Sequence, residues 1–508
     1  MTGKILCRVS QTRFFQGSRG FRAERHGRLD PGINGVHFQL LQDGGSVSDK
    51  GVWALIGGKV LIQSSDRLSR QFLYRMKEIG QNMKTALILV LPLLLVPWGV
   101  TCSAEEHMDL FVFEGSWFEM GRQYGENCTH IEEVYDFFVD TWKDYGFTME
   151  ALRQEVERYK EYIDREKNIA DFMRGIGEGS SLKDDTLLSA YEKVIVINSG
   201  FEILWLSDWH HSKKLCTAMG ARGNATRNGH TVVGLNRDLP TYPFSYQIAY
   251  VLKPDIAPVI FGTVTEGQVA SNFQVSSDRL FVGAVKVLGD WSPARGIYEC
   301  SYGLPSTALM LKMSMCRSVD EALKTLDETQ ATQGMNYMLA DPSRIVVVEK
   351  LPFHYALREP EKDVIVLTNQ MRADYSYEDG KRTSIPMSER VDVSADPSAE
   401  AVEYCYNSAY WALMNNHGRI SPYIWMEVIS GMHYCYDRDG DVLLEKDGVP
   451  VLEAGLTVEY QHYEEGKLTD GTVASHCCDL DTLDIYWVRG LPSRHDQWQK
   501  INLEVLKG

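Results

Sequence analysis

Residues 215–238 have the sequence LCTAMGARGNATRNGHTVVGLNRD, the most informative segment of the chain. Two strand-like runs flank an Asn-Gly pair at 228–229, and this pair is favoured in tight β-turns. Across such a hairpin, residues at the start of the first strand face residues at the end of the second. We therefore expect Cys216 and Asp238 to be neighbours in space.

A thiol beside an Asn, Arg and Asp cluster is a candidate nucleophile. The nearby charge of Arg237 would favour the thiolate, which is the reactive form of cysteine. The alternative for Cys216 is a buried structural cysteine or one half of a disulfide, and this hairpin alone does not decide between the two.

Composition excludes two broad classes of protein. The 508 residues are 44% hydrophobic, which permits a large core and rules out wholesale disorder. With 52 Lys and Arg against 69 Asp and Glu the net charge is −17, so the chain does not suit binding to a nucleic-acid backbone. The charge is uneven, because residues 1–82 carry 13 basic and 6 acidic residues.

Residues 83–104 resemble an export signal. Met83 and Lys84 form a short basic region, an apolar run follows from Thr85 to Val100, and Cys102-Ser103-Ala104 offers small residues for cleavage before Glu105. The alternative is a transmembrane helix, which needs about 20 apolar residues. This run is shorter and contains two prolines, which favours a cleaved signal and no stable membrane insertion afterwards.

The segment before this signal shows no sustained periodicity. Residues 1–82 are interpreted as an extension that is either not translated, with Met83 as the true start, or a disordered basic tail. The exported product would be secreted or occupy another extracytoplasmic compartment, which is oxidising. Its eight cysteines include no CxxC pair, which argues against a structural zinc site. We expect no metal and no cofactor.

Two halves follow the signal. Residues 105–215 are predicted to be helical, with one long helix over 149–174 and a capping box at Ser181-Leu182-Lys183-Asp184 opening the next. Residues 216–508 alternate short strands with turn residues, and Ser318-Val319-Asp320-Glu321 is a second capping box. Blocks of strands with grouped helices indicate an α+β fold.

Five motifs in order resemble the acyl-CoA:isopenicillin N acyltransferase family of cysteine-nucleophile Ntn hydrolases. The first is Cys216-Thr217 followed by a Gly-x-Asn-x-Asp segment at 234–238. The others are E-M-G-x-x-x-G at 119–125, G-M-N-Y-M-L-A-D at 334–341, L-T-N-Q at 367–370, and T-V-A-S at 472–475 with G-L-P at 490–492. Together they span about 114–495.

The resemblance implies a four-layer αββα Ntn-hydrolase sandwich with an N-terminal helical pro-segment. Cleavage before Cys216 would give an alpha fragment, 105–215, and a catalytic beta fragment, 216–508, which stay associated. It would also free the α-amine of Cys216. An α-amino group has a pKa of about 7.7–8.0, so it can accept the thiol proton without a histidine.

By the same resemblance, Cys216 matches the nucleophile, Asp238 the carboxylate that orients its amine, and Asn369 a donor to the oxyanion. Arg390 matches a later arginine near the nucleophile, and Arg382 competes for that role. The chain departs from the family motifs at Leu215, where the family often has Gly, and at Gln370, where it has His after the Asn. Leu235 stands where the more distantly related bile-salt hydrolases have Arg, which argues against close bile-salt hydrolase or ceramidase behaviour.

Two functions remain open at this point. The first is an autoproteolytically activated amidohydrolase or acyltransferase that forms a thioester on Cys216 and acts on small N-acyl or peptide-like amides. Because acyl-CoA is scarce outside cells, hydrolysis is expected to outweigh acyl transfer. The second is a secreted binding protein on the same fold without catalysis.

Overall fold

The computed structural model describes two units of the chain. Three short strands belong to the N-terminal unit, 10–104, and form an antiparallel sheet in the order β1 (Val36–His37), β2 (Val52–Ile56) and β3 (Lys59–Gln63). The larger unit is described over 107–507, with gaps at 206–215, 241–245, 287–301, 333, 351–354, 370–375, 379–380, 384–396, 432–433, 438, 447, 452–455, 460 and 465–466. The signal segment, 83–104, lies outside the described residues.

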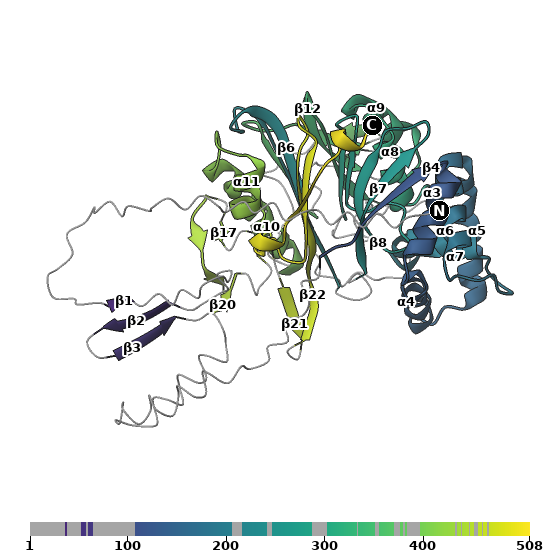
Figure 1. Ribbon diagram of the computed structural model, residues 1–508, viewed down its shortest axis with the longest axis horizontal. Coiled ribbons are helices and arrows are strands. Elements are labelled where there is room, and N and C mark those ends of the chain that lie inside the picture. Colours follow the sequence, from purple (N-terminus) through teal and green to yellow (C-terminus); the bar gives the residue numbers. More distant parts are fainter. Residues whose placement is uncertain are drawn as a thin grey trace, which may run out of the picture. The chain divides into compact units, whose positions relative to one another are not determined.

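Two sheets form the middle of the larger unit (Figure 1). The first sheet has the order β13-β12-β11-β10-β9-β8-β7-β4. Its strands are β4 (Leu110–Gly115), β7 (Gln247–Pro254), β8 (Ile260–Thr265), β9 (Phe273–Ser276), β10 (Phe281–Lys286), β11 (Met335–Asp341), β12 (Arg344–Lys350) and β13 (Tyr355–Arg358). All its pairs are antiparallel except β4 with β7.

The second sheet has the order β14-β5-β6-β22-β23-β24, with β21 pairing to β22. Its strands are β5 (Thr217–Gly223), β6 (Gly229–Pro240), β14 (Val364–Leu367), β21 (Gln461–Glu464), β22 (Lys467–Asp479), β23 (Asp484–Arg489) and β24 (Gln499–Asn502). Short two-stranded pairs lie at β15 (Ser376–Glu378) with β16 (Lys381–Thr383), β17 (Cys435–Tyr436) with β18 (Val442–Leu443), and β19 (Glu445–Lys446) with β20 (Val449–Pro450).

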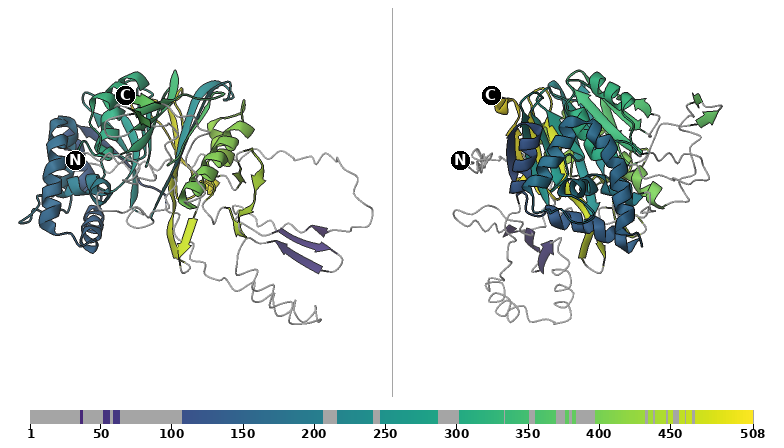
Figure 2. Two further views of the ribbon diagram at one scale, coloured as in Figure 1. Left: turned by 180° about the vertical axis from the view of Figure 1, so that it is seen from behind. Right: turned by 90° about the vertical axis from the view of Figure 1, so that its right-hand side faces the viewer.

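Helices cover both outer faces of the paired sheets (Figure 2). One layer packs on the first sheet and contains α3 (Trp117–Asn127), α4 (Ile131–Asp144), α5 (Met149–Arg165), α6 (Lys167–Gly179), α7 (Ala190–Trp205), α8 (Ser306–Ser314) and α9 (Val319–Glu328). The other packs on the second sheet and contains α10 (Pro397–Asn415), α11 (Pro422–Ile424) and the π-helical turn η4 (Trp425–Ile429). Two 3-10 turns, η5 (His495–Gln497) and η6 (Glu504–Leu506), lie near the C-terminus.

Three separate apolar cores define these layers. One lies between the large helical layer and the first sheet, one between the two sheets, and one between the second sheet and α10. The predicted αββα sandwich is therefore confirmed by the packing of this chain. No helix in the described ranges is both long and apolar enough to cross a membrane.

Three details of the helical half, 105–215, differ from the sequence prediction. Residues 110–115 are predicted to be helical but form strand β4, because they pair with the distant strand β7. The helix predicted over 149–174 is two helices, because the chain leaves helical geometry at Glu166 between α5 and α6. The capping box was placed too early. The Ser189 hydroxyl accepts from the Glu192 N–H at 3.3 Å, and the Glu192 carboxylate accepts from the Ser189 N–H at 2.8 Å, so α7 begins near Ala190.

The helical half, 105–215, is joined to the rest of the larger unit through a strand as well as through helices. Strand β4, which precedes α3, lies parallel to β7 and extends the first sheet. Near the end of α7, the buried carboxylate of Glu202 accepts hydrogen bonds from the Ser306 N–H at 2.7 Å and the Ser306 hydroxyl at 2.6 Å. Glu202 thus caps α8 across the expected cleavage point.

This cap gives a pH-dependent prediction. Burial raises the pKa of Glu202 above its ordinary 4.5, so the folded state holds this proton more tightly than the unfolded state. Its contribution to stability is present below pH 4.5 and is lost as the pH rises through the folded pKa. Glu202→Gln keeps an acceptor oxygen without the charge. We therefore expect the variant to melt about 2 °C or more above wild type at pH 7, and at the same temperature as wild type at pH 4.

The matched control lies on the same helix. Although Glu192 is partly desolvated, hydrogen bonds from Lys160 and Ser189 lower its pKa, which gives the opposite sign. Glu192→Gln should therefore lose stability at pH 7. Thermal melts of both variants and wild type at pH 4 and pH 7 check the pair, and equal shifts of the two variants would contradict the assignment.

Candidate active site

The predicted site residues gather at one end of three adjacent strands. Cys216 comes directly before β5, Asn369 comes two residues after β14, and Asp238 lies near the end of β6. Ala218 pairs with both Leu367 and Leu235. If this antiparallel register continues beyond the paired residues, Cys216 stands opposite Asn369 on one side and Arg237 on the other.

The Cys216 thiol lies against the backbone of Asp238. Its Sγ is 3.4 Å from both the carbonyl oxygen and the amide nitrogen of Asp238, as donor to the first and acceptor from the second. The side chain is only 3% exposed and forms no disulfide. The hairpin has thus brought Cys216 and Asp238 into contact, while their catalytic roles stay predictions.

Asp238 and Arg237 lie on opposite faces of β6, because successive residues of a strand alternate. The Asp238 carboxylate is buried near Cys405 of α10, whose Sγ is 3.0 Å from the Thr217 hydroxyl. Burial raises the pKa of Cys405 to about 12, and the charge of Asp238 adds to the effect. This second thiol beside the site therefore stays protonated and does not compete as a nucleophile.

Arg237 points between the sheets, on the same face as Cys216. Its guanidinium donates to Gln247 of β7 and, at 3.3 Å each, to Thr265 of β8 and to Gln268. Burial lowers the pKa of Arg237 to about 10, and the nearby Cys216 opposes that change. Arg237 is therefore still a cation at neutral pH, where its charge favours the Cys216 thiolate.

The buried histidine of the site region is not placed to act as a base. His476 of β22 donates from Nδ1 to the Leu235 carbonyl at 3.1 Å and accepts at Nε2 from the Thr263 hydroxyl at 2.7 Å. Burial, with a contribution from the charge of Arg237, lowers its pKa to about 3. Both ring nitrogens are occupied and the ring is neutral, so a base for the thiol must come from elsewhere.

Asn369 is fixed in place by hydrogen bonds of its own side chain and of its neighbour Thr368. Its amide Nδ2 donates to the Lys286 carbonyl at 2.6 Å, and the Asn336 side chain donates to the Thr368 carbonyl at 3.0 Å. One N–H of the Asn369 amide thus fixes the side chain, which leaves the second for a reacting oxygen.

The structure adds a residue that sequence reasoning missed. The Asn272 amide lies 4.0 Å from Cys216 Sγ and donates to the Ala284 carbonyl at 2.6 Å. It stands just before β9, in the opposite sheet, so only the stacking of the two sheets brings it to the thiol. It is a second amide donor at the site.

Other predicted positions are not described. Arg390, Gln370 and Leu215 lie outside the described residues. For Arg382 the structure describes only its place in β16. The choice between Arg390 and Arg382 therefore stays open.

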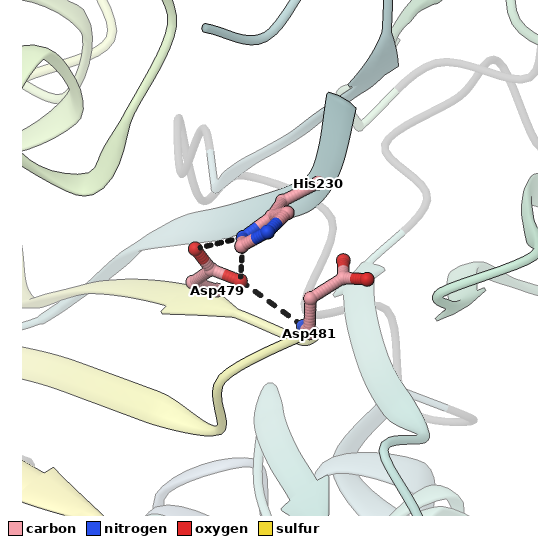
Figure 3. A group of neighbouring side chains, drawn as sticks. All are labelled: His230, Asp479 and Asp481. Atoms are coloured by element: carbon pink, nitrogen blue, oxygen red, sulfur yellow. Dashed lines mark hydrogen bonds and ion pairs between the residues drawn. The ribbon is translucent and has the colours of Figure 1, made fainter. Parts of the chain in front are cut away.

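A separate cluster has the donor set of a metal site. His230, Asp479 and Asp481 approach one another where β6 begins and β22 ends (Figure 3). Asp479 accepts from His230 Nδ1 at 2.9 Å and from the Asp481 N–H at 3.0 Å, and Asp481 accepts from the Thr231 N–H at 2.8 Å. Both carboxylates thus already accept hydrogen bonds from the protein itself. These bonds connect the start of β6 with the end of β22, which explains the cluster without a metal.

Comparison with known proteins gives structural neighbours only. No family model matches the chain, and no curated protein matches it. A mutant conjugated bile acid hydrolase from Clostridium perfringens is 11% identical with a TM-score of 0.36, over 57% of this chain and 94% of that one. A Caenorhabditis elegans N-acylethanolamine-hydrolyzing acid amidase ortholog is 13% identical with a TM-score of 0.32, over 52% and 93%.

A third neighbour is the penicillin V acylase from Agrobacterium tumefaciens, 11% identical with a TM-score of 0.30, over 54% of this chain and 83% of that one. Scores this low carry no weight for function. The αββα fold is established by the sheets and cores of this chain.

Proposed function

We propose that the chain is an exported amidohydrolase that cleaves itself between Leu215 and Cys216 and then uses Cys216 as its N-terminal nucleophile. One observation carries the proposal most. A thiol at the end of a central strand contacts the Asp238 backbone, lies beside a buried cation, and has two amide side chains nearby. Export is supported by the signal-like segment 83–104.

The chemistry follows from these groups. The freed α-amine takes the thiol proton, and the thiolate attacks the carbonyl carbon of a linear amide. In this proposal, side-chain N–H groups of Asn369 and Asn272 stabilise the oxygen that becomes negative. The C–N bond breaks, the amine leaves with the proton, and water hydrolyses the thioester to a carboxylic acid and the thiol. An amine acceptor in place of water would give acyl transfer.

A panel of N-acyl compounds tests this function. Incubation of the secreted protein should release free amine from linear amides, and added hydroxylamine should divert the acyl group to a hydroxamate. Neither product from any member of the panel would refute the proposal and favour a binding protein without catalysis.

The role of Asp238 gives a separate prediction. Asp238→Asn keeps the size of the side chain and removes the charge that would orient the α-amine. We expect kcat to fall by about 10²-fold or more, because proton transfer of this kind contributes that much. Asp255→Asn, an exposed change in the turn after β7, is the control. Steady-state kinetics decide it, and equal kcat values for the two variants would rule out the role.

A further inference from the structure

Arg237 is a buried cation for which the described part of the chain offers no counter-ion. Its side chain is 2% exposed, and its three hydrogen-bond acceptors, on Gln247, Thr265 and Gln268, are all neutral. Its Nε–H is buried and donates to no atom of the described part of the chain. No carboxylate among the described residues pairs with it.

The charged and titratable groups around Arg237 do not neutralise it. On the neighbouring strand β22, His476 is uncharged and both its nitrogens are occupied. The Asp238 carboxylate lies on the other face of β6, toward Cys405. Cys216 is the group whose charge acts on Arg237, and it is an anion only in its thiolate form. Burying an unpaired charge is unfavourable, so an anion that reaches Arg237 would be bound favourably.

The reaction itself supplies no lasting anion. The thiolate is consumed when the C–S bond forms, and the thioester is neutral. A carboxylate carried by the substrate would stay charged throughout, and a guanidinium binds a carboxylate through paired N–H donors. Because Arg237 is set opposite Cys216, such a carboxylate must lie within a few bonds of the carbonyl that the sulfur attacks. An amino acid linked through its nitrogen meets this condition.

We propose that Arg237 is the specificity-determining residue of the site and binds the carboxylate of an N-acyl amino acid whose amide Cys216 cleaves. This inference rests on the proposed function. The sulfur forms a bond to the acyl carbon, the C–N bond breaks, and the nitrogen takes a proton. The amino acid leaves with its carboxylate, and water releases the acyl group as a carboxylic acid.

A matched substrate pair tests the proposal. N-dodecanoylglycine and N-dodecanoylethanolamine share the acyl chain. The first carries a carboxylate where the second carries a hydroxymethyl group. For the processed wild-type protein we expect kcat/KM to favour the glycine conjugate by about 100-fold. Arg237→Gln should bring this ratio close to one, and Arg237→Lys, which keeps the charge, should retain part of the preference.

The ratio of the two kcat/KM values separates carboxylate recognition from an effect of Arg237 on folding or on the thiolate. Either of those effects would lower the cleavage rates of both substrates equally. A wild-type ratio near one overturns the inference even if Arg237→Gln does not fold. A ratio that survives in Arg237→Gln also overturns it, and assigns the arginine to the thiol alone. If the protein cleaved neither of these substrates nor any other amide, the proposed function itself would be refuted.

Discussion

Replacing Cys216 with alanine is expected to leave the chain uncut and to lower amide hydrolysis by about 10⁴-fold or more, since one sulfur serves both reactions. Self-cleavage needs the thiol to attack the carbonyl of residue 215, and hydrolysis needs the same thiol after its amine is free. Gel mobility and amine release from one preparation measure the two effects together.

Cys478→Ala is the matched control. Cys478 belongs to the same core between the sheets, and burial raises the pKa of its thiol, so it is not a nucleophile. This variant should be cut and active. If Cys216→Ala were cut at the same place or kept wild-type hydrolysis, another group would have to perform the chemistry.

The second large effect is expected at Gly121, in the crossing of α3 and α6. A Cβ atom on Gly121 would lie 2.1 Å from the Phe172 carbonyl oxygen, and one on Gly175 would lie 2.1 Å from the Phe118 carbonyl oxygen. A Cβ on Gly179 would lie 2.1 Å from the Arg122 carbonyl oxygen, and one on Gly125 would lie 2.5 Å from the Ile176 carbonyl oxygen. Each helix therefore turns two glycines, four residues apart, toward the other helix. The two backbones are in contact there, and any larger side chain would keep them apart.

Gly121→Val should force the two helices apart and destabilise the protein by at least about 3 kcal/mol, the upper range for overpacking. We expect little folded protein, and a lowered urea midpoint for what remains. Glu126→Val adds the same side chain on the exposed surface of α3 and should change the midpoint little. Equal midpoints for the two variants would show that the helices do not cross as closely as described.

This crossing also shows what sequence reasoning achieved in the helical half. The E-x-G-x-x-x-G element at 119–125 resembles a family motif, and its physical reason in this chain is the packing of its glycines against α6. The break at Glu166 was missed because 149–174 is rich in helix formers throughout, and the separation of α5 from α6 comes from tertiary packing. Strand β4 was missed because its partner β7 is more than a hundred residues away.

The strand-rich half, 216–508, was more predictable where contacts are local. The hairpin from Cys216 to Asp238 follows from its turn and spacing, and the Ser318 cap of α9 follows from its capping box. Asn272 and the neutral partners of Arg237 come from the facing sheet. No local pattern encodes how two sheets stack, so these residues became visible only in the folded chain.

The most direct measurement is the N-terminal residue and intact mass of the fragments in protein purified after secretion. The account predicts two associated fragments, one of which begins with Cys216 and carries a free α-amine. A single chain that begins at Glu105 and nonetheless hydrolyses amides, or a cut at any other bond, would contradict it.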